Sequence, residues 1–199
     1  MLIKYAWLLY KMIKVNNHEN KPIAIVCVTR SGSTALSDEL GKQYNLTNFE
    51  EAFHPCFPQS LNELENEPRF LFNIKCTQLN DDNKERFMHL YNKSYRIRLQ
   101  RKDSVLRTAS NYMLKTTGIP HYRQPPPNLT YRIVIDHKLL DRIIHQVKIE
   151  DLKLSNWPYP IDEELYYEDL IFEHTSLHVY PKPENYQDLI DLISQKLKD

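Results

Sequence analysis

The sequence predicts an α/β protein with three layers, α/β/α, in which helices cover both faces of a mostly parallel central sheet. Residues 23–28 form a continuous apolar run rich in β-branched side chains, which is typical of a strand buried on both faces. A small polar loop over residues 29–34 and a helical pattern follow this run directly. Strand-like and helix-like segments then alternate along the chain, which is the pattern of a parallel sheet with crossover helices.

The remaining elements follow from apolar periodicity and from capping residues at the ends of segments. In chain order we expect a helix over 35–40 ended by Gly41, a strand over 70–77, a helix capped by Asp81 and Asp82 that runs to about 91, a strand over 94–100, a helix from the Asp103 cap to about 117, an amphipathic helix over 136–151, a strand over 164–167 and a helix over 187–197. Arginines alternate with apolar residues in the strand over 94–100, so this strand is expected to have one wetter face. The apolar stripe of the helix over 136–151 predicts that it packs against the core.

The bulk composition predicts a single domain over residues 1–199. A hydrophobic content of 41% is enough for one core in a chain of this length. Lys plus Arg and Asp plus Glu number 26 each, so no global positive field favours nucleic acid as a partner. Any anion-binding site must therefore be local.

The cysteines indicate the compartment. Cys27, Cys56 and Cys76 are too few and too irregularly spaced for a disulfide framework or a zinc site. We therefore expect no metal and a reducing, cytoplasmic environment.

The N-terminal segment, residues 1–20, is apolar and aromatic but is interrupted by lysines. Its uncharged runs are too short for a membrane span or a signal peptide. It predicts a helix that packs on the domain or at an interface, such as that of a homodimer. A helix lying in a membrane interface is the alternative.

The loop over residues 29–34 contains Gly32, one of only three glycines in the chain. A residue without Cβ lets successive backbone N–H groups curl around an oxyanion, and the following helix N-terminus presents positive charge to the same group. Ser33 and Thr34 add hydroxyl donors, and Arg30 adds a guanidinium suited to phosphate or sulfate. The loop lacks the first glycine and the lysine of the GxxxxGK[ST] motif, which disfavours ATP hydrolysis. An ordinary turn between strand and helix is the alternative.

The segment VCVTRSGST, residues 26–34, resembles the 5'-phosphosulfate loop of sulfotransferases that use 3'-phosphoadenosine-5'-phosphosulfate (PAPS). It is most similar to the loop of the trehalose sulfotransferase group, which also contains RSGST. The resemblance implies a P-loop-like sulfotransferase fold with PAPS as the sulfuryl donor. It assigns donor binding in this loop to Arg30, Ser31, Gly32, Ser33 and Thr34.

A second segment, residues 99–110, resembles the 3'-phosphate motif of the same family. There, an arginine at a strand end and a serine further along the next helix bind the 3'-phosphate of the donor, and Arg101 and Ser110 match these positions. A phosphate dianion needs charge-assisted donors, which agrees with this assignment. Lys102 or Arg107 could assist or replace Arg101. The alternative is a surface turn followed by a serine that faces solvent.

A third segment, residues 49–53, is similar to the part of the trehalose sulfotransferase group that supplies a catalytic glutamate, and Glu51 matches its position. A general base would take the proton of the acceptor hydroxyl as its oxygen attacks sulfur. His54 is the competing base, because imidazole titrates near neutral pH. Lys75 resembles a strand-end lysine that many sulfotransferases place near the transferred group, and an exposed strand-end lysine is its alternative. The segment YEDL at residues 167–170 also resembles a family segment, to which we assign no catalytic role.

The resemblance extends from about residue 23 to 170 and implies in-line transfer of a sulfuryl group to an acceptor hydroxyl, without a metal. Two departures from the family pattern concern the substrates. The chain lacks the late glycine-rich basic loop that closes over the donor in many members, and it leaves little length for an acceptor pocket. Either the proline-rich loop around residues 125–127 and a second subunit complete the site, or the donor binds more weakly. The acceptor's identity stays open, with a carbohydrate or small metabolite expected.

Two other functions compete with sulfuryl transfer. The chain could be a catalytically silent binding protein with the sulfotransferase fold, which would tolerate alanine at Glu51 and His54. It could also be a P-loop-like nucleotide-binding kinase relative, which would require ATP, magnesium and an acidic metal ligand at a strand end.

Overall fold

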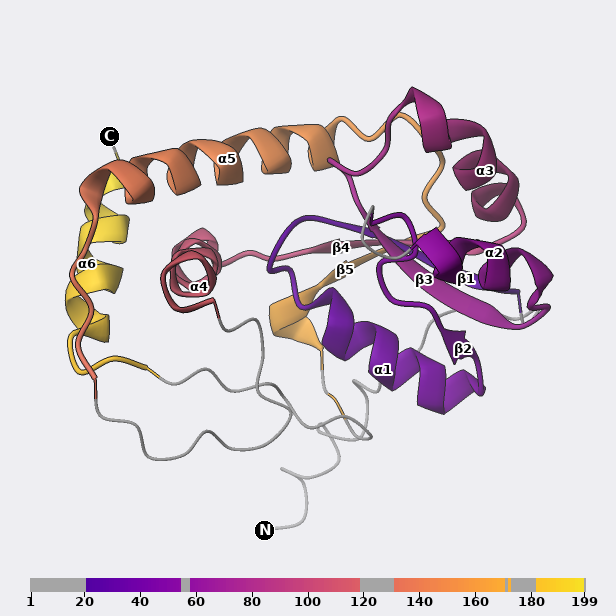
Figure 1. Cartoon of the computed structure of the whole chain (residues 1–199), viewed down its shortest axis with the longest axis horizontal. Helices are drawn as coiled ribbons and strands as arrows, with labels where there is room; N and C mark the ends of the chain where they lie inside the picture. Colours follow the sequence, from indigo (N-terminus) through magenta and orange to yellow (C-terminus); the bar gives the residue numbers. More distant parts are fainter. Residues whose placement is uncertain (1–20, 55–57, 119–130, 171, 173–181, 199) are drawn as a thin grey trace, which may run out of the picture.

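The computed structural model describes residues 21–54, 58–118, 131–170, 172 and 182–198. The apolar segment over residues 1–20, Cys56 and the prolines at 125–127 lie outside these residues, so the expectations for them stay predictions. The described part begins at the first strand and ends in the last helix (Figure 1).

A sheet of five parallel strands forms the middle layer. Its order is β2 (Thr47–Asn48), β3 (Phe70–Lys75), β1 (Ile23–Cys27), β4 (Tyr95–Gln100) and β5 (Glu163–Tyr166). Every neighbouring pair is parallel, and β1 pairs with both β3 and β4 over most of its length. The first apolar run therefore lies at the centre of the sheet, where both of its faces are buried.

Helices cover both faces of this sheet (Figure 1). The described helices are α1 (Ser33–Tyr44), α2 (Pro58–Asn66), α3 (Asp81–Asn92), α4 (Ser104–Thr117), α5 (His137–Ser155) and α6 (Tyr186–Lys196), of which α6 packs with α4 and α5 beside the sheet. Side chains of β1 alternate between the faces: Ile23 and Ile25 pack with Leu36 of α1, whereas Ala24 and Val26 pack in the cluster that contains residues of α2 and α3. This arrangement confirms the predicted three-layer α/β/α class with a parallel sheet.

A third apolar cluster joins α4, α5 and α6 beside the sheet. Tyr112 of α4, Leu140 and Ile143 of α5 and Leu189 of α6 are buried in it. The other end of α5 reaches the sheet, because Leu154 belongs to the cluster over β1 and β3. Helix α5 thus spans the molecule from α6 toward α3 (Figure 1), and its middle passes the ends of the strands.

Several boundaries differ from the expected ones. Gly41 does not end α1, because the left-handed residue that closes this helix is Asn45, at φ 51°, whose N–H bonds to carbonyls of the last turn. Asn80, rather than Asp81 or Asp82, caps α3, since its side chain accepts the N–H of the third helical residue. Tyr167 begins a short 3-10 turn (Tyr167–Asp169) instead of ending β5.

Two elements were not predicted from the sequence. Strand β2 has only two residues, and α2 begins at Pro58 without a strong apolar run before it. By contrast, the Asp103 cap, the Gly118 end of α4 and the Asp136 cap of α5 are confirmed. The wetter face of β4 is also confirmed, because Arg96 and Arg98 form ion pairs with Asp162 and Glu164.

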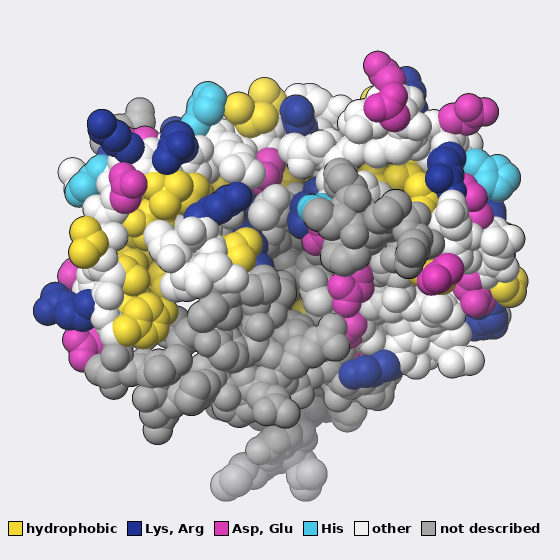
Figure 2. Space-filling model, viewed as in Figure 1, with side chains coloured by type: hydrophobic (Ala, Val, Ile, Leu, Met, Phe, Trp, Pro, Cys, Tyr) yellow, Lys and Arg dark blue, Asp and Glu magenta, His cyan; other side chains and the backbone are white. Residues whose placement is uncertain are grey.

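The described surface carries charges of both signs. Lys and Arg side chains are interspersed with Asp and Glu on the visible face, and hydrophobic side chains gather over the side where α4 and α6 lie (Figure 2). Among the described residues, no helix combines the length and the hydropathy that crossing a membrane requires.

Candidate functional site

The loop between β1 and α1 is shaped to receive an anion. Arg30 and Gly32 both have positive φ, 62° and 88°, so the backbone turns sharply before α1. The first helical hydrogen bond runs from Leu36 N–H to the Gly32 carbonyl, and no side chain caps the helix. The amides of Ser33 and Thr34 precede this bond and are free for a ligand at the positive end of the helix.

Two of the predicted donor-binding segments meet at this loop. The Nε of Arg30 donates a hydrogen bond to Ser110 Oγ at 2.9 Å, across 80 residues of chain. The Nη1 of Arg101 donates to the carbonyl oxygen of Arg30 at 3.2 Å. Ser110 is therefore a buried residue that faces the loop, and the alternative of a solvent-facing serine is wrong.

The two arginines concentrate positive charge beside the loop. Burial, and secondarily the nearby charge of Arg101, lower the pKa of Arg30 to about 10. The guanidinium is still protonated at neutral pH, but it is held in an unfavourable environment that an anion would relieve. A perturbed cation at a helix N-terminus is a physical indication of an anion site.

Tyr167 covers the loop from the side of β5. A Cβ added to Gly32 would lie 2.1 Å from the ring atom Cδ2 of Tyr167, so only glycine fits there. The guanidinium of Arg101 lies over the same ring, 5.2 Å from its centroid, and Arg101 Nε lies 3.5 Å from a carboxylate oxygen of Glu168. The YEDL segment thus orients Arg101, and its Tyr167 leaves no room for a side chain at position 32.

A buried ion pair holds the start of the loop. Arg107 Nη2 lies 2.8 Å from Glu150 Oε2, and both side chains are 1% exposed. Glu150 accepts the N–H of Thr29 at 3.1 Å and its hydroxyl at 3.0 Å, while Arg107 Nε donates to the Thr29 carbonyl at 3.0 Å. These bonds fix the peptide that precedes Arg30.

This ion pair was not predicted from the sequence as part of the site. One sequence signal could have found it. Glu150 falls on the apolar stripe of α5 with Ile143, Val147 and Leu154, and an acidic side chain buried there needs a partner of opposite charge. Arg107 is consequently committed to Glu150 and Asp151 and does not replace Arg101. Lys102 pairs with Asp169 on the surface.

The residues predicted to carry catalysis also meet one another. Lys75 Nζ lies 2.5 Å from Glu51 Oε1, and each side chain is about one fifth exposed, at 21% and 22%. Gln78 Nε2 donates to the other oxygen of Glu51 at 2.9 Å. His54 is placed by a tight turn, in which its N–H donates to the Glu51 carbonyl at 2.8 Å. Glu51, His54 and Lys75 thus form one cluster at the end of β3.

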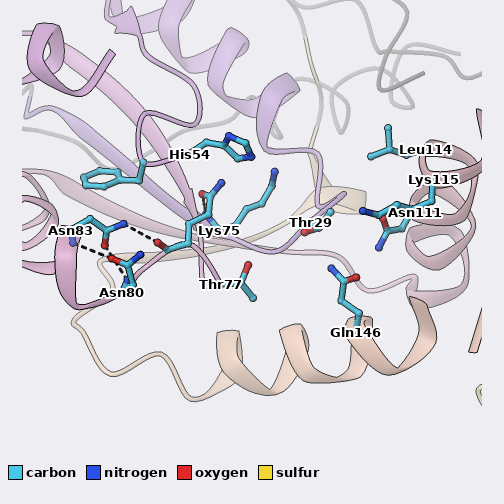
Figure 3. A pocket seen from close by; sticks show the side chains of 12 residues that line it. Thr29, His54, Lys75, Thr77, Asn80, Asn83, Asn111, Leu114, Lys115 and Gln146 are labelled. Atoms are coloured by element: carbon cyan, nitrogen blue, oxygen red, sulfur yellow. Dashed lines mark hydrogen bonds between the residues drawn. The ribbon is translucent and has the colours of Figure 1, made fainter. Parts of the chain in front are cut away.

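A cavity of about 360 Å³ adjoins this cluster and the loop. Lys75 and His54 line one side, Asn111 and Lys115 of α4 line the opposite side, and Thr29 lies between them (Figure 3). The cavity is at the ends of the parallel strands where the chain leaves the sheet, which is the usual ligand position in open α/β sheets. It was not predicted from the sequence, because it depends on how α4 and α5 pack beside the sheet.

The described residues contain no group of three or more His, Cys, Asp or Glu side chains arranged to hold a metal ion. Cys27 and Cys76 are free thiols, and burial raises the pKa of both, to about 12 for Cys76. Neither is activated as a nucleophile.

No family model and no curated protein matches the chain. Solved structures similar to it include three shikimate kinases, with TM-scores of 0.41 to 0.45. The Aquifex aeolicus enzyme shares 11% identity over 89% of this chain and 96% of its own, with a TM-score of 0.41. The Acinetobacter baumannii enzyme, in complex with shikimate, shares 11% identity over 89% and 93%, with a TM-score of 0.43. The Bacteroides thetaiotaomicron enzyme shares 12% identity over 90% and 99%, with a TM-score of 0.45. These values are too low to transfer a function or a residue's role to this chain.

Proposed function

We propose that the chain is a nucleotide-dependent transferase, and specifically a sulfotransferase that moves a sulfuryl group from PAPS to an acceptor hydroxyl. The observation that carries the proposal is the hydrogen bond from Arg30 to Ser110. It joins two segments that resemble the 5'-phosphosulfate loop and the 3'-phosphate motif of one family, although they are far apart in the sequence. A donor with anionic groups at both ends of its ribose requires such a pair of sites side by side.

The residues of the loop fit the phosphosulfate end of this donor. The hydroxyl groups of Ser31 and Ser33 lie beside the thiol of Cys27 in the loop, and the amides of Ser33 and Thr34 lie in the first turn of α1. When bound, PAPS would supply an activated sulfuryl group and a leaving group that becomes more negative during transfer. Arg30 and these amides would stabilise that charge, which is typically worth a few kcal/mol for each preorganised donor.

Arg101 and Ser110 would hold the 3'-phosphate. The guanidinium of Arg101 is oriented by the ring of Tyr167 and by Glu168, whose carboxylate lies 3.5 Å from Arg101 Nε. Ser110 already accepts a hydrogen bond from Arg30, so its hydroxyl proton can be donated to a phosphate oxygen. Charge-assisted bonds of this kind are about twice as strong as neutral ones.

Glu51 would take the proton of the acceptor hydroxyl. Its contact with Lys75 orients the carboxylate, and the lysine would remain to stabilise negative charge on the transferred group. His54 lines the same cavity and is the second candidate for the base. In either case the nucleophile would approach from the cavity side, opposite to the leaving group in the loop.

Phosphoryl transfer from a nucleoside triphosphate is the second candidate function. It would use the same helix N-terminus, because a phosphoryl group presents similar oxygens to the amides. Ser33 and Thr34 open α1, so a hydroxyl is available there for a magnesium ion, although the loop lacks the lysine of the usual motif.

A transfer assay with two labelled donors separates these functions. The protein is incubated with one mixture of hydroxyl compounds and either PAPS labelled in its sulfuryl group or magnesium ATP labelled in its γ-phosphate. The proposal predicts label transfer from PAPS alone and its loss in Arg30→Ala. Transfer from ATP alone would establish the second candidate, and transfer from neither would favour a catalytically silent protein.

A further inference from the structure

Most of the residues that line the cavity beside Glu51 and Lys75 have polar side chains. Of its twelve lining residues only Phe53 and Leu114 are apolar, and five are amides: Gln78, Asn80, Asn83, Asn111 and Gln146. Small-molecule sites are usually lined mainly by apolar and aromatic groups with a few polar ones. The number of polar groups in this lining suits a ligand that carries several oxygen atoms.

Most of these amides are engaged in local structure. Asn80 and Asn83 cap α3 reciprocally, and Gln78 bonds Glu51 and the backbone of Lys75. Gln146 donates its amide N–H to Glu150 at 2.8 Å, which fixes the side chain and leaves its carbonyl oxygen for a donor. These residues shape the cavity but keep few groups for a ligand.

Asn111 is different because its whole amide lacks a partner. The side chain is 1% exposed, and neither Oδ1 nor Nδ2 forms a hydrogen bond with any described residue. Leaving both groups of a buried amide unpaired is costly, so such a residue in a cavity wall indicates a missing ligand. Figure 3 shows Asn111 on α4 across the cavity from Lys75.

We propose that Asn111 binds the acceptor through a second hydroxyl, and that the cavity selects small molecules that carry more than one hydroxyl group. One amide presents a donor and an acceptor together, and a hydroxyl can both accept and donate. With one hydroxyl at Glu51, a second hydroxyl of the same molecule would satisfy Asn111 and the carbonyl of Gln146. This inference rests on the proposed function, since it takes the cavity as the acceptor site.

The position of Asn111 links acceptor binding to donor binding. Ser110, the preceding residue, contacts Arg30 in the loop, and successive residues of a helix point about 100° apart. One turn of α4 therefore faces the donor with Ser110 and the cavity with Asn111. The helix would hold the two substrates in a fixed mutual orientation, which is a main contribution to catalysis of group transfer.

Calorimetric titrations with matched probes test the inference. The probes are cyclohexane-1,2-diol and myo-inositol, which carry adjacent hydroxyls, and cyclohexanol, which has the same ring and one hydroxyl. Each is titrated into the wild type, Asn111→Leu and Asn92→Leu, a surface control with the same change on α3. All titrations are run with and without adenosine 3',5'-bisphosphate.

In the wild type we expect the diol or inositol to bind about tenfold tighter than cyclohexanol, which corresponds to one good hydrogen bond to a buried group. Asn111→Leu should abolish this preference without lowering the melting temperature, because it removes an unpaired polar group. Asn92→Leu should change neither the preference nor the melting temperature.

Three outcomes would overturn the inference. They are equal binding of the three probes by the wild type, no binding of the diol or inositol by the wild type, and a preference that is kept in Asn111→Leu. The wild-type comparison stands even if the variant does not fold. Failure of the bisphosphate to bind, with the diol preference intact, would instead count against the donor assignment.

Discussion

Arg30 Nε donates a hydrogen bond to Ser110 Oγ at 2.9 Å, and this contact fixes the geometry between the first loop and α4. Because the carbonyl of Arg30 also accepts from Arg101, the arginine joins the predicted sites for both ends of the donor. Its guanidinium is held next to another cation, which an anion between them would stabilise.

Ser110→Ala should weaken binding of adenosine 3',5'-bisphosphate about tenfold, because it removes one hydrogen bond to a charged group and the partner of Arg30. The dissociation constant is measured by calorimetry. Ser194→Ala is a matched control, since Ser194 is also a helical serine but bonds only the carbonyl of Ile190 in α6. An equal loss in both variants would contradict the assignment of Ser110.

Glu51→Gln should lower the rate of sulfuryl transfer by about 100-fold or more, since general base catalysis contributes factors of this size. Binding of the bisphosphate should be unchanged, because Glu51 lies on the acceptor side. Glu65→Gln is the control, as Glu65 pairs with Arg86 at the surface, away from the cavity. If His54→Asn loses this rate while Glu51→Gln keeps it, the histidine is the base and our choice between them is wrong.

Arg107→Ala should lower the free energy of unfolding by about 3–5 kcal/mol, because it leaves Glu150 as an unpaired buried charge. Lys196→Ala breaks an exposed ion pair with Asp141 and should cost about 1 kcal/mol or less. Urea denaturation of both variants measures the difference. A similarly small loss of unfolding free energy in the two variants would show that the bonds of Arg107 and Glu150 to Thr29 do not hold the loop.

Gly32→Ala should be more destabilising than Gly118→Ala. Both glycines have positive φ, 88° and 68°, where alanine costs about 1–2 kcal/mol. Only at Gly32 would the new Cβ also meet the ring of Tyr167, whereas at Gly118 it would meet open space. Thermal unfolding compares the two, and an equal shift in melting temperature would mean that Tyr167 moves freely away from the loop.

The sequence was sufficient for the central part of the fold. The apolar run of β1, the polar loop and the caps Asp103 and Asp136 are local signals, and the structure has a strand, a turn and helices where they predict them. Gly41 misled the prediction, because a glycine can end a helix only if the chain adopts positive φ there, and Asn45 takes that role.

The site was predictable only where its residues belong to linear motifs. Arg30 and Ser110 could each be assigned to the donor in advance, because each lies in a segment that resembles one family. Glu51 and Lys75 could be assigned to the transfer site for the same reason, whereas the contacts within both pairs come from the structure. Asn111 and Glu150 could not be assigned, because their roles depend on how α4 and α5 pack beside the sheet. Such long-range packing leaves only a weak signal in a single sequence.

The most direct measurement is a calorimetric titration of the protein with adenosine 3',5'-bisphosphate, compared with magnesium ATP. Arg101→Ala removes the proposed 3'-phosphate ligand, and Arg96→Ala, which removes an ion-paired arginine of β4, the strand that ends just before Arg101, is the control. Our account predicts binding of one bisphosphate per chain that is weakened about tenfold or more in Arg101→Ala, unchanged in Arg96→Ala and absent for ATP. No binding of the bisphosphate at millimolar concentration, or binding that survives in Arg101→Ala, would contradict the assignment of this loop and helix to a PAPS site.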